Sequence, residues 1–111
     1  MSFPTTKKIT LQPHDAGLVY AFKFPISTSS TANDGYLPNG TTISGVSLEA
    51  YNSANTTTSG WYSITTFNND TVNVSMDYPG SADSYKLTFV LTLSSGATIE
   101  ADFYNIEAKN K

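Results

Sequence analysis

Two carboxylates lie at a spacing that could support acid–base chemistry. Glu100 and Asp102 are two residues apart in the segment TIEADFYNI, residues 98 to 106. If this segment is a β-strand, both side chains lie on the same face, at about 7 Å from each other. A carboxylate pair at such a separation activates water in inverting glycosidases. Any two acids on one strand face have this spacing, however, so we expect no catalytic residue here.

The other side chains that could take part in catalysis or metal binding have no suitable partners near them in the sequence. His14 is the only histidine and follows Pro13 in an expected turn, where it should be solvated. Residues 68 to 70, Asn-Asn-Asp, could offer oxygen ligands to calcium, but they lack the EF-hand spacing and are typical of a turn. There is no cysteine, and therefore no thiolate nucleophile or cysteine zinc site. We expect a protein that is not an enzyme and that binds neither a metal nor a cofactor.

The elements that must position these residues are strands. Residues 84 to 106 form two alternating runs joined by Ser-Ser-Gly-Ala, which predicts a β-hairpin with one apolar face. The residues expected on its core side are Tyr85, Leu87, Phe89, Leu91, Leu93, Ile99, Ala101 and Phe103. The opposite face carries mainly threonine and charged residues, so it should face solvent or a partner.

Five further segments show apolar and polar residues in alternation, bounded by turn residues. Strands are expected in residues 7–12, 18–24, 41–52, 61–67 and 71–78, and a long polar connection over residues 26–40. Gly45, between two apolar residues that are out of phase, predicts a β-bulge. Since each strand has one apolar face to bury, two packed sheets are expected: an all-β sandwich of about seven antiparallel strands.

Size and composition fit one domain with a weakly charged surface. The chain has 111 residues, which we divide into a short N-terminal arm, residues 1–8, and a β-sandwich, residues 9–111. Charged residues make up 14% of the chain, against about 25% in an average soluble domain. With no arginine and a net charge of −3, nucleic acid is not an expected partner, and no apolar run is long enough to predict a membrane span.

Two groups of residues are candidates for contacts with other proteins. The first is the arm, with Phe3, Pro4, Lys7 and Lys8, although a solvated end is an alternative for the lysine pair. The second is a set of aromatic residues in or beside the expected loops, where they could anchor an interface or stack on sugars. Its members are Tyr36, Tyr51, Trp61 and Tyr62. Trp61 could instead cap the core, because adjacent strand residues such as Trp61 and Tyr62 point to opposite faces.

Several of these segments together resemble a known group of proteins. The resemblance is carried by Phe3-Pro4, Gly40–Ser44, Val72–Gly80, Tyr85–Leu93, Ser95-Gly96 and Thr98–Ile106. In this pattern the chain resembles small immunoglobulin-like accessory proteins of tailed-bacteriophage virions. Two segments depart from the pattern: YAFKF has no tryptophan, and PGSAD replaces a Gly-Gly turn. Tyr85 also lies where immunoglobulin-like domains have a tyrosine corner, although a tyrosine that simply begins a strand is an equal alternative.

The resemblance implies an immunoglobulin-like sandwich and a structural role in the virion, after assembly in the host cytoplasm. It implies a capsid cement or decoration protein, favoured as a trimer, that binds the major capsid protein through its arm and loops. An adaptor between fibres and the neck or tail, in contact with neck or tail proteins, is the alternative within the group. A carbohydrate-binding or adhesive sandwich is a further alternative, based on the aromatic residues.

Overall fold

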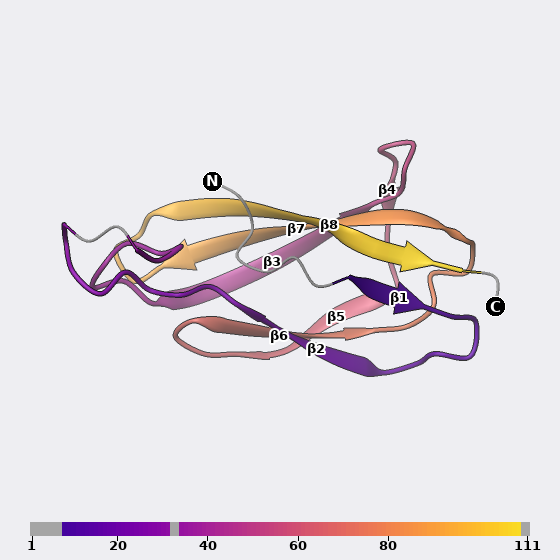
Figure 1. The fold of residues 1–111 in the computed structure, drawn as a ribbon, viewed down its shortest axis with the longest axis horizontal. Coiled ribbons are helices and arrows are strands. Elements are labelled where there is room, and N and C mark those ends of the chain that lie inside the picture. Colours follow the sequence, from indigo (N-terminus) through magenta and orange to yellow (C-terminus); the bar gives the residue numbers. More distant parts are fainter. Residues whose placement is uncertain (1–7, 32–33, 110–111) are drawn as a thin grey trace.

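The computed structural model describes residues 8–31 and 34–109, and in these residues the fold is all-β with two sheets (Figure 1). The strands are β1 (Ile9–Leu11), β2 (Leu18–Lys23), β3 (Ile43–Tyr51), β4 (Thr57–Thr58), β5 (Tyr62–Phe67), β6 (Thr71–Met76), β7 (Asp83–Leu93) and β8 (Thr98–Ala108). All seven segments expected as strands contain one. The eighth strand, β4, lies between two of the expected strands, after residues 41–52 and before residues 61–67.

The strands divide into two layers that lie face to face (Figure 1). One sheet has the order β1-β8-β7-β3-β4, and the other has the order β2-β6-β5. The expectation that every pair is antiparallel is wrong for β1, which runs parallel to β8 with Ile9 opposite Ile106. Only strands separated by a long connection can pair in parallel, and here nearly the whole domain lies between the two.

The core lies between the sheets, on the faces that the alternation predicted. The expected core residues of β7 are all buried, as are Ala101 and Phe103 of β8, while Ile99 is partly buried against them. Phe22 of β2 joins the layers, since its ring centroid lies 4.9 Å from that of Phe89 and 5.2 Å from that of Phe103. Such tilted aromatic pairs add to the gain from apolar burial.

Bulges adjust the register at two places that matter for the outer face. The pairing of β3 with β7 shifts between Ile43 and Gly45, which confirms the bulge expected at the glycine. A second shift occurs where Tyr85 pairs with Ile106 but Leu87 pairs with Phe103, so β8 carries one extra residue. No glycine lies at this second bulge to signal it in the sequence. It reverses the alternation of β8, so that odd-numbered residues face the core before it and even-numbered residues after it.

The long connection between β2 and β3 is held by its own contacts. Ile26 and Leu37 form a parallel bridge, and Asp34 accepts hydrogen bonds from the backbone and the hydroxyl of Thr28. Gly35 packs so closely that an added Cβ would lie within 2.7 Å of the Pro25 carbonyl oxygen, which leaves no room for a side chain. This connection forms one end of the sandwich (Figure 1).

Tyr85 ties the start of β7 to the turn before it. Its hydroxyl donates a hydrogen bond of 3.0 Å to the carbonyl oxygen of Ser81, four residues upstream, and its ring packs at 5.2 Å from that of Trp61. The side chain is buried, so the hydroxyl has few alternative partners.

We expect Tyr85→Phe to lower the free energy of unfolding by about 1 kcal/mol, because the ring stays in place while the hydrogen bond is lost. Urea denaturation followed by circular dichroism measures this loss. Tyr20→Phe is the matched control, since the half-buried Tyr20 makes no hydroxyl hydrogen bond within the described part of the chain. Equal loss of stability in the two variants would contradict the role given to the Tyr85 hydroxyl.

Candidate interaction surface

The outer face of the five-stranded sheet carries most of the charged side chains of the hairpin together with the exposed Tyr104. Strand pairing aligns them in rows across β3, β7 and β8, because cross-strand partners share a face. One row joins Ser47, Val90 and Glu100, and the next joins Glu49, Thr88 and Asp102. Tyr51 and Lys86 begin the third row. We call this the outer face of the large sheet.

Lys86 lies between two tyrosines on this face. Its Nζ atom is 4.7 Å from the ring centroid of Tyr51 and 5.7 Å from that of Tyr104, within the range of cation–π attraction. Each tyrosine also donates to an acid two residues before it on its own strand: Tyr51 to Glu49 at 2.6 Å, and Tyr104 to Asp102 at 3.4 Å. The hydrogen bond to Glu49 raises the pKa of the Tyr51 hydroxyl above its ordinary value. Two acids, two rings and one cation therefore form a linked group.

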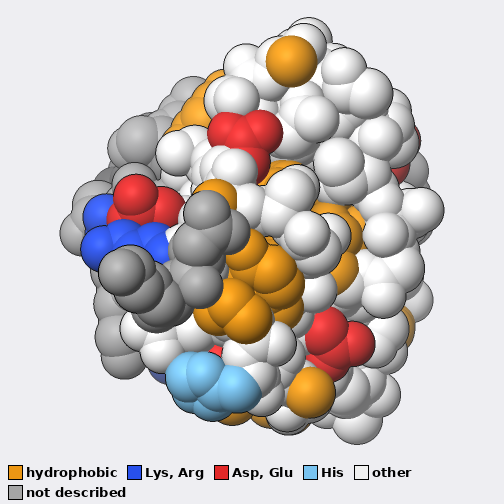
Figure 2. Space-filling model, turned by 90° about the vertical axis from the view of Figure 1, so that its right-hand side faces the viewer, with side chains coloured by type: hydrophobic (Ala, Val, Ile, Leu, Met, Phe, Trp, Pro, Cys, Tyr) orange, Lys and Arg blue, Asp and Glu red, His pale blue; other side chains and the backbone are white. Residues whose placement is uncertain are grey.

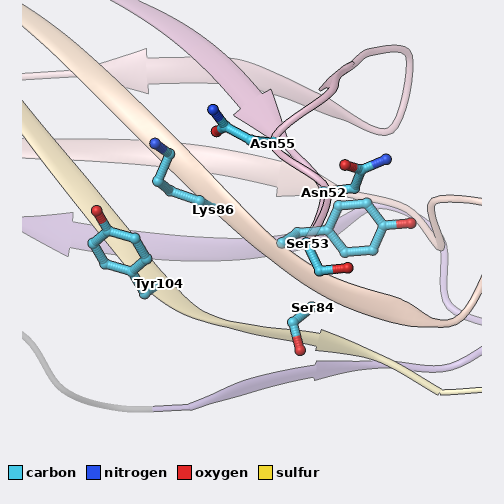
Figure 3. A pocket seen from close by; sticks show the side chains of 7 residues that line it. Asn52, Ser53, Asn55, Ser84, Lys86 and Tyr104 are labelled. Carbon is cyan, nitrogen blue, oxygen red and sulfur yellow. The ribbon is translucent and has the colours of Figure 1, made fainter.

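A shallow hollow of about 230 Å³ lies beside this group (Figure 3). It is lined by Asn52, Ser53, Asn55, Ser84, Tyr85, Lys86 and Tyr104. The Oδ1 atom of Asn52 accepts hydrogen bonds from the backbone N–H groups of Ala54 and Thr56, which fixes the turn after β3. In Figure 3 the side chains of Lys86 and Tyr104 extend from neighbouring strands to one side of the hollow. The lining combines two tyrosine rings with amide, hydroxyl and ammonium groups, so it offers both stacking and hydrogen-bonding contacts.

In the described part of the chain, only β1 pairs with the edge of β8 next to this face, so most of this edge has no partner strand. β1 covers β8 only at Ile106 to Ala108, and no other described strand pairs with that side of β8. The Leu93 amide donates to the Ala97 carbonyl, and Leu91 pairs with Ile99, so the backbone groups of Ile99, Ala101 and Phe103 point to β7. The alternate residues from Thr98 to Asp102 therefore direct their N–H and C=O groups outward. This open edge is a ready position for another strand.

The acids along this edge have no lysine partner in the described part of the chain. Asp102 accepts a hydrogen bond of 2.7 Å from Thr88, and Glu100 is exposed. Farther along, where β1 covers the edge, Glu107 lies 2.7 Å from Lys8 Nζ and 3.9 Å from Lys109 Nζ. The covered part of the edge is thus neutralised by lysines, and the open part keeps its negative charge.

The outer face of the three-stranded sheet is different. Its side chains are short and mostly neutral, with Val19 59% exposed and Lys23 3.9 Å from Asp70. At one end of the sandwich His14 lies 3.3 Å from Asp15 and beside a small hydrophobic area (Figure 2). Lysine side chains gather at one side of this end beside an acidic group, and further acidic side chains lie apart from them (Figure 2).

The predicted interface residues are distributed unevenly. Phe3, Pro4 and Lys7 lie outside the described residues, whereas Lys8 is half of the ion pair at the β8 edge. Trp61 is only 3% exposed, and its indole N–H donates to the Thr58 hydroxyl at 3.0 Å.

Of the remaining aromatic candidates, Tyr36 is 8% exposed and packs on Phe24, so neither it nor Trp61 has much ring surface for a partner. The loop position of Tyr36 suggested exposure, but its ring is buried, whereas Trp61 adopts the alternative in which it caps the core. Tyr51 and Tyr62 are half-buried, and burial raises the pKa of Tyr62. Tyr104, which is 66% exposed, was not among the candidates, although its outward position in the alternation signalled it.

Other kinds of site find little support in this part of the molecule. No three histidine or acidic side chains among the described residues could hold a metal ion together. Within the same residues there is no helix long and apolar enough to span a membrane.

No protein-family model matches the chain, and no curated protein or solved structure matches it either.

The Lys8–Glu107 pair gives a pH-dependent prediction. The hydrogen bond from Lys8 is the main cause that holds the pKa of Glu107 below its ordinary value, so the pair stabilises the fold above the unfolded-state pKa. This contribution is lost as the pH falls through the lowered pKa. We expect Lys8→Met to move the pKa of Glu107 upward, as measured by carbon NMR titration of the carboxyl group.

Lys23→Met is the control for this titration, because Lys23 pairs with Asp70 on the other sheet and should leave Glu107 unchanged. A Glu107 pKa that is the same with and without the Lys8 ammonium would contradict the assignment.

Proposed function

We propose that this chain is a non-enzymatic structural protein of a tailed-phage virion, built on an immunoglobulin-like sandwich. The observation that carries the proposal is the surface around β8. An open strand edge lies next to a face of paired tyrosines and acids, and this arrangement offers backbone and side-chain contacts to another protein. The sequence resemblance to virion accessory proteins is the reason for proposing a tailed-phage virion as the assembly.

The strand order supports the immunoglobulin-like part of the proposal. In that fold strands B, E and D lie in one sheet, and strands G, F and C with C′ lie in the other. The order β2-β6-β5 corresponds to the first set, and β8-β7-β3-β4 corresponds to the second. The hydrogen bond from Tyr85 to Ser81 has the form of a tyrosine corner at the start of strand F.

Within the virion, a capsid cement or decoration protein is the preferred role. Such a protein is present in many copies close together, and a surface with few charges limits repulsion between neighbours. The major capsid protein is then the partner, and the arm, residues 1–8, adds a second attachment. A trimer would bring three open edges to one site on the shell. An adaptor that joins fibres to the neck or tail would use the same edge at low copy number.

A carbohydrate-binding module is a second candidate, and one observation favours it. Tyr104 presents an exposed ring beside the polar hollow, and aromatic rings next to amide and hydroxyl groups are suited to sugars. Trp61, one of the loop residues that suggested sugar binding, is buried. A sugar would therefore stack on Tyr104 of β8 and not on the aromatic residues of the loops.

Particle association tests the proposal directly. We expect the tagged chain, produced in cells infected with the phage that encodes it, to sediment with intact virions and not to remain free. Quantitative mass spectrometry of the particles should give hundreds of copies for a cement protein and about a dozen for an adaptor ring, as set by the symmetry of each location.

A free chain beside complete particles would contradict a virion role. If the free chain bound glycans in the same experiment, the carbohydrate-binding candidate would replace it. Deletion of residues 1–8 gives a further comparison, since loss of occupancy with an unchanged circular dichroism spectrum would assign attachment to the arm.

A further inference from the structure

The molecule contains its own example of how the β8 edge is covered. β1 lies parallel to β8 and accepts a hydrogen bond of 2.9 Å from the Lys109 amide at the Leu11 carbonyl. Ile9 and Leu11 point to the core, whereas Lys8 and Thr10 point outward. Lys8 then reaches Glu107, the acid that β8 presents on this outer side. An added strand thus supplies apolar side chains inward and a cation outward.

The open part of the β8 edge also has an apolar inner side and an acidic outer side. Ile99, Ala101 and Phe103 lie on its inner side, and Ile99 is only partly buried. Glu100 and Asp102 lie on its outer side and have no lysine within ion-pair distance in the described part of the chain. A strand that continued the pattern would place apolar residues beside the first set and cations beside the second.

We propose that the β8 edge from Thr98 to Tyr104 binds an extended segment of a partner protein, parallel to β8, that alternates apolar residues with lysine or arginine. Main-chain hydrogen bonds would provide affinity in this β-augmentation, and the two acids would select the sequence. The inference rests on the proposed function only for the partner's location in a virion, and the binding mode can be tested without it.

Two other occupants fit the charges less well. If the segment before Lys8 continued the alternation of β1 along this edge, its outward positions would hold Thr6, Pro4 and Ser2. None of these residues is a cation. A second copy paired through the same edge would bring Glu100 and Asp102 against their own equivalents. Like charges opposite each other across strands are destabilising.

The test uses the full-length chain and a short capped peptide that alternates lysine and valine. We expect titration with this peptide to shift the amide resonances of residues 98 to 104 in nitrogen–proton NMR spectra. A peptide with glutamate in place of lysine should bind at least roughly tenfold more weakly, because it meets the acids with like charge.

Three variants separate the backbone contribution from the charge. Glu100→Thr removes one acid and should weaken binding, whereas Glu100→Pro also removes an outward N–H and should abolish it. Proline is tolerated where the missing N–H faces solvent, and circular dichroism checks that the variant is folded. Asp70→Asn is the matched control, because this acid lies in the turn between β5 and β6 of the other sheet, and it should leave binding unchanged.

Several results would overturn the inference. These are shifts confined to the edges of β2 or β5, equal affinity for the two peptides, or binding that survives Glu100→Pro. Failure of the lysine peptide to bind until residues 1–7 are deleted would identify the chain's own arm as the occupant. Concentration-dependent dimerisation through residues 98 to 104 would identify a second copy. If the peptide fails while the chain still sediments with virions, this inference falls and the proposed function stands.

Discussion

The pairing of β7 with β8 is the constraint on which the rest of the molecule depends. Each strand has eleven residues, and their register decides which side chains enter the core and which form the outer face of the large sheet. A slip of one residue would exchange Phe89 and Leu91 for Thr88 and Val90. The aromatic contacts from Phe22 to Phe89 and Phe103 hold the second sheet to this hairpin, so the same register also places the two layers.

This pairing satisfies only one side of β8, and the surface that remains has distinct properties. Outward backbone groups, two acids without lysine partners among the described residues and an exposed Tyr104 lie together along a strand whose far end is already covered by β1. A strand edge of this kind is a risk for unspecific association unless it is shielded or used. Negative charge at Glu100 and Asp102 discourages pairing between copies, and it simultaneously favours a cationic partner. Protection and recognition can thus come from the same two residues.

Much of the fold was predictable because period-two alternation is a local property. The inward and outward sets of β6, β7 and the first half of β8 follow directly from it, and the bulge at Gly45 was signalled by a glycine between out-of-phase apolar residues. The parallel pairing of β1, the second bulge in β8 and the burial of Tyr36 depend on contacts between distant segments, which leave no local pattern. For the site, the loop position of the aromatic residues was a poor guide to exposure. The outward phase of Tyr104 was a better one.

The central claim is that β8 has one occupied and one open side between Thr98 and Asp102. Amide hydrogen exchange of the free full-length protein, resolved by residue with NMR, tests it most directly, because exchange is slow where an N–H is held in a buried ladder. The account predicts slow exchange at Ile99, Ala101 and Phe103, whose amides face β7, and fast exchange at Glu100 and Asp102, whose amides face outward. Equally slow exchange at all five residues would contradict it, since the edge would then already be filled.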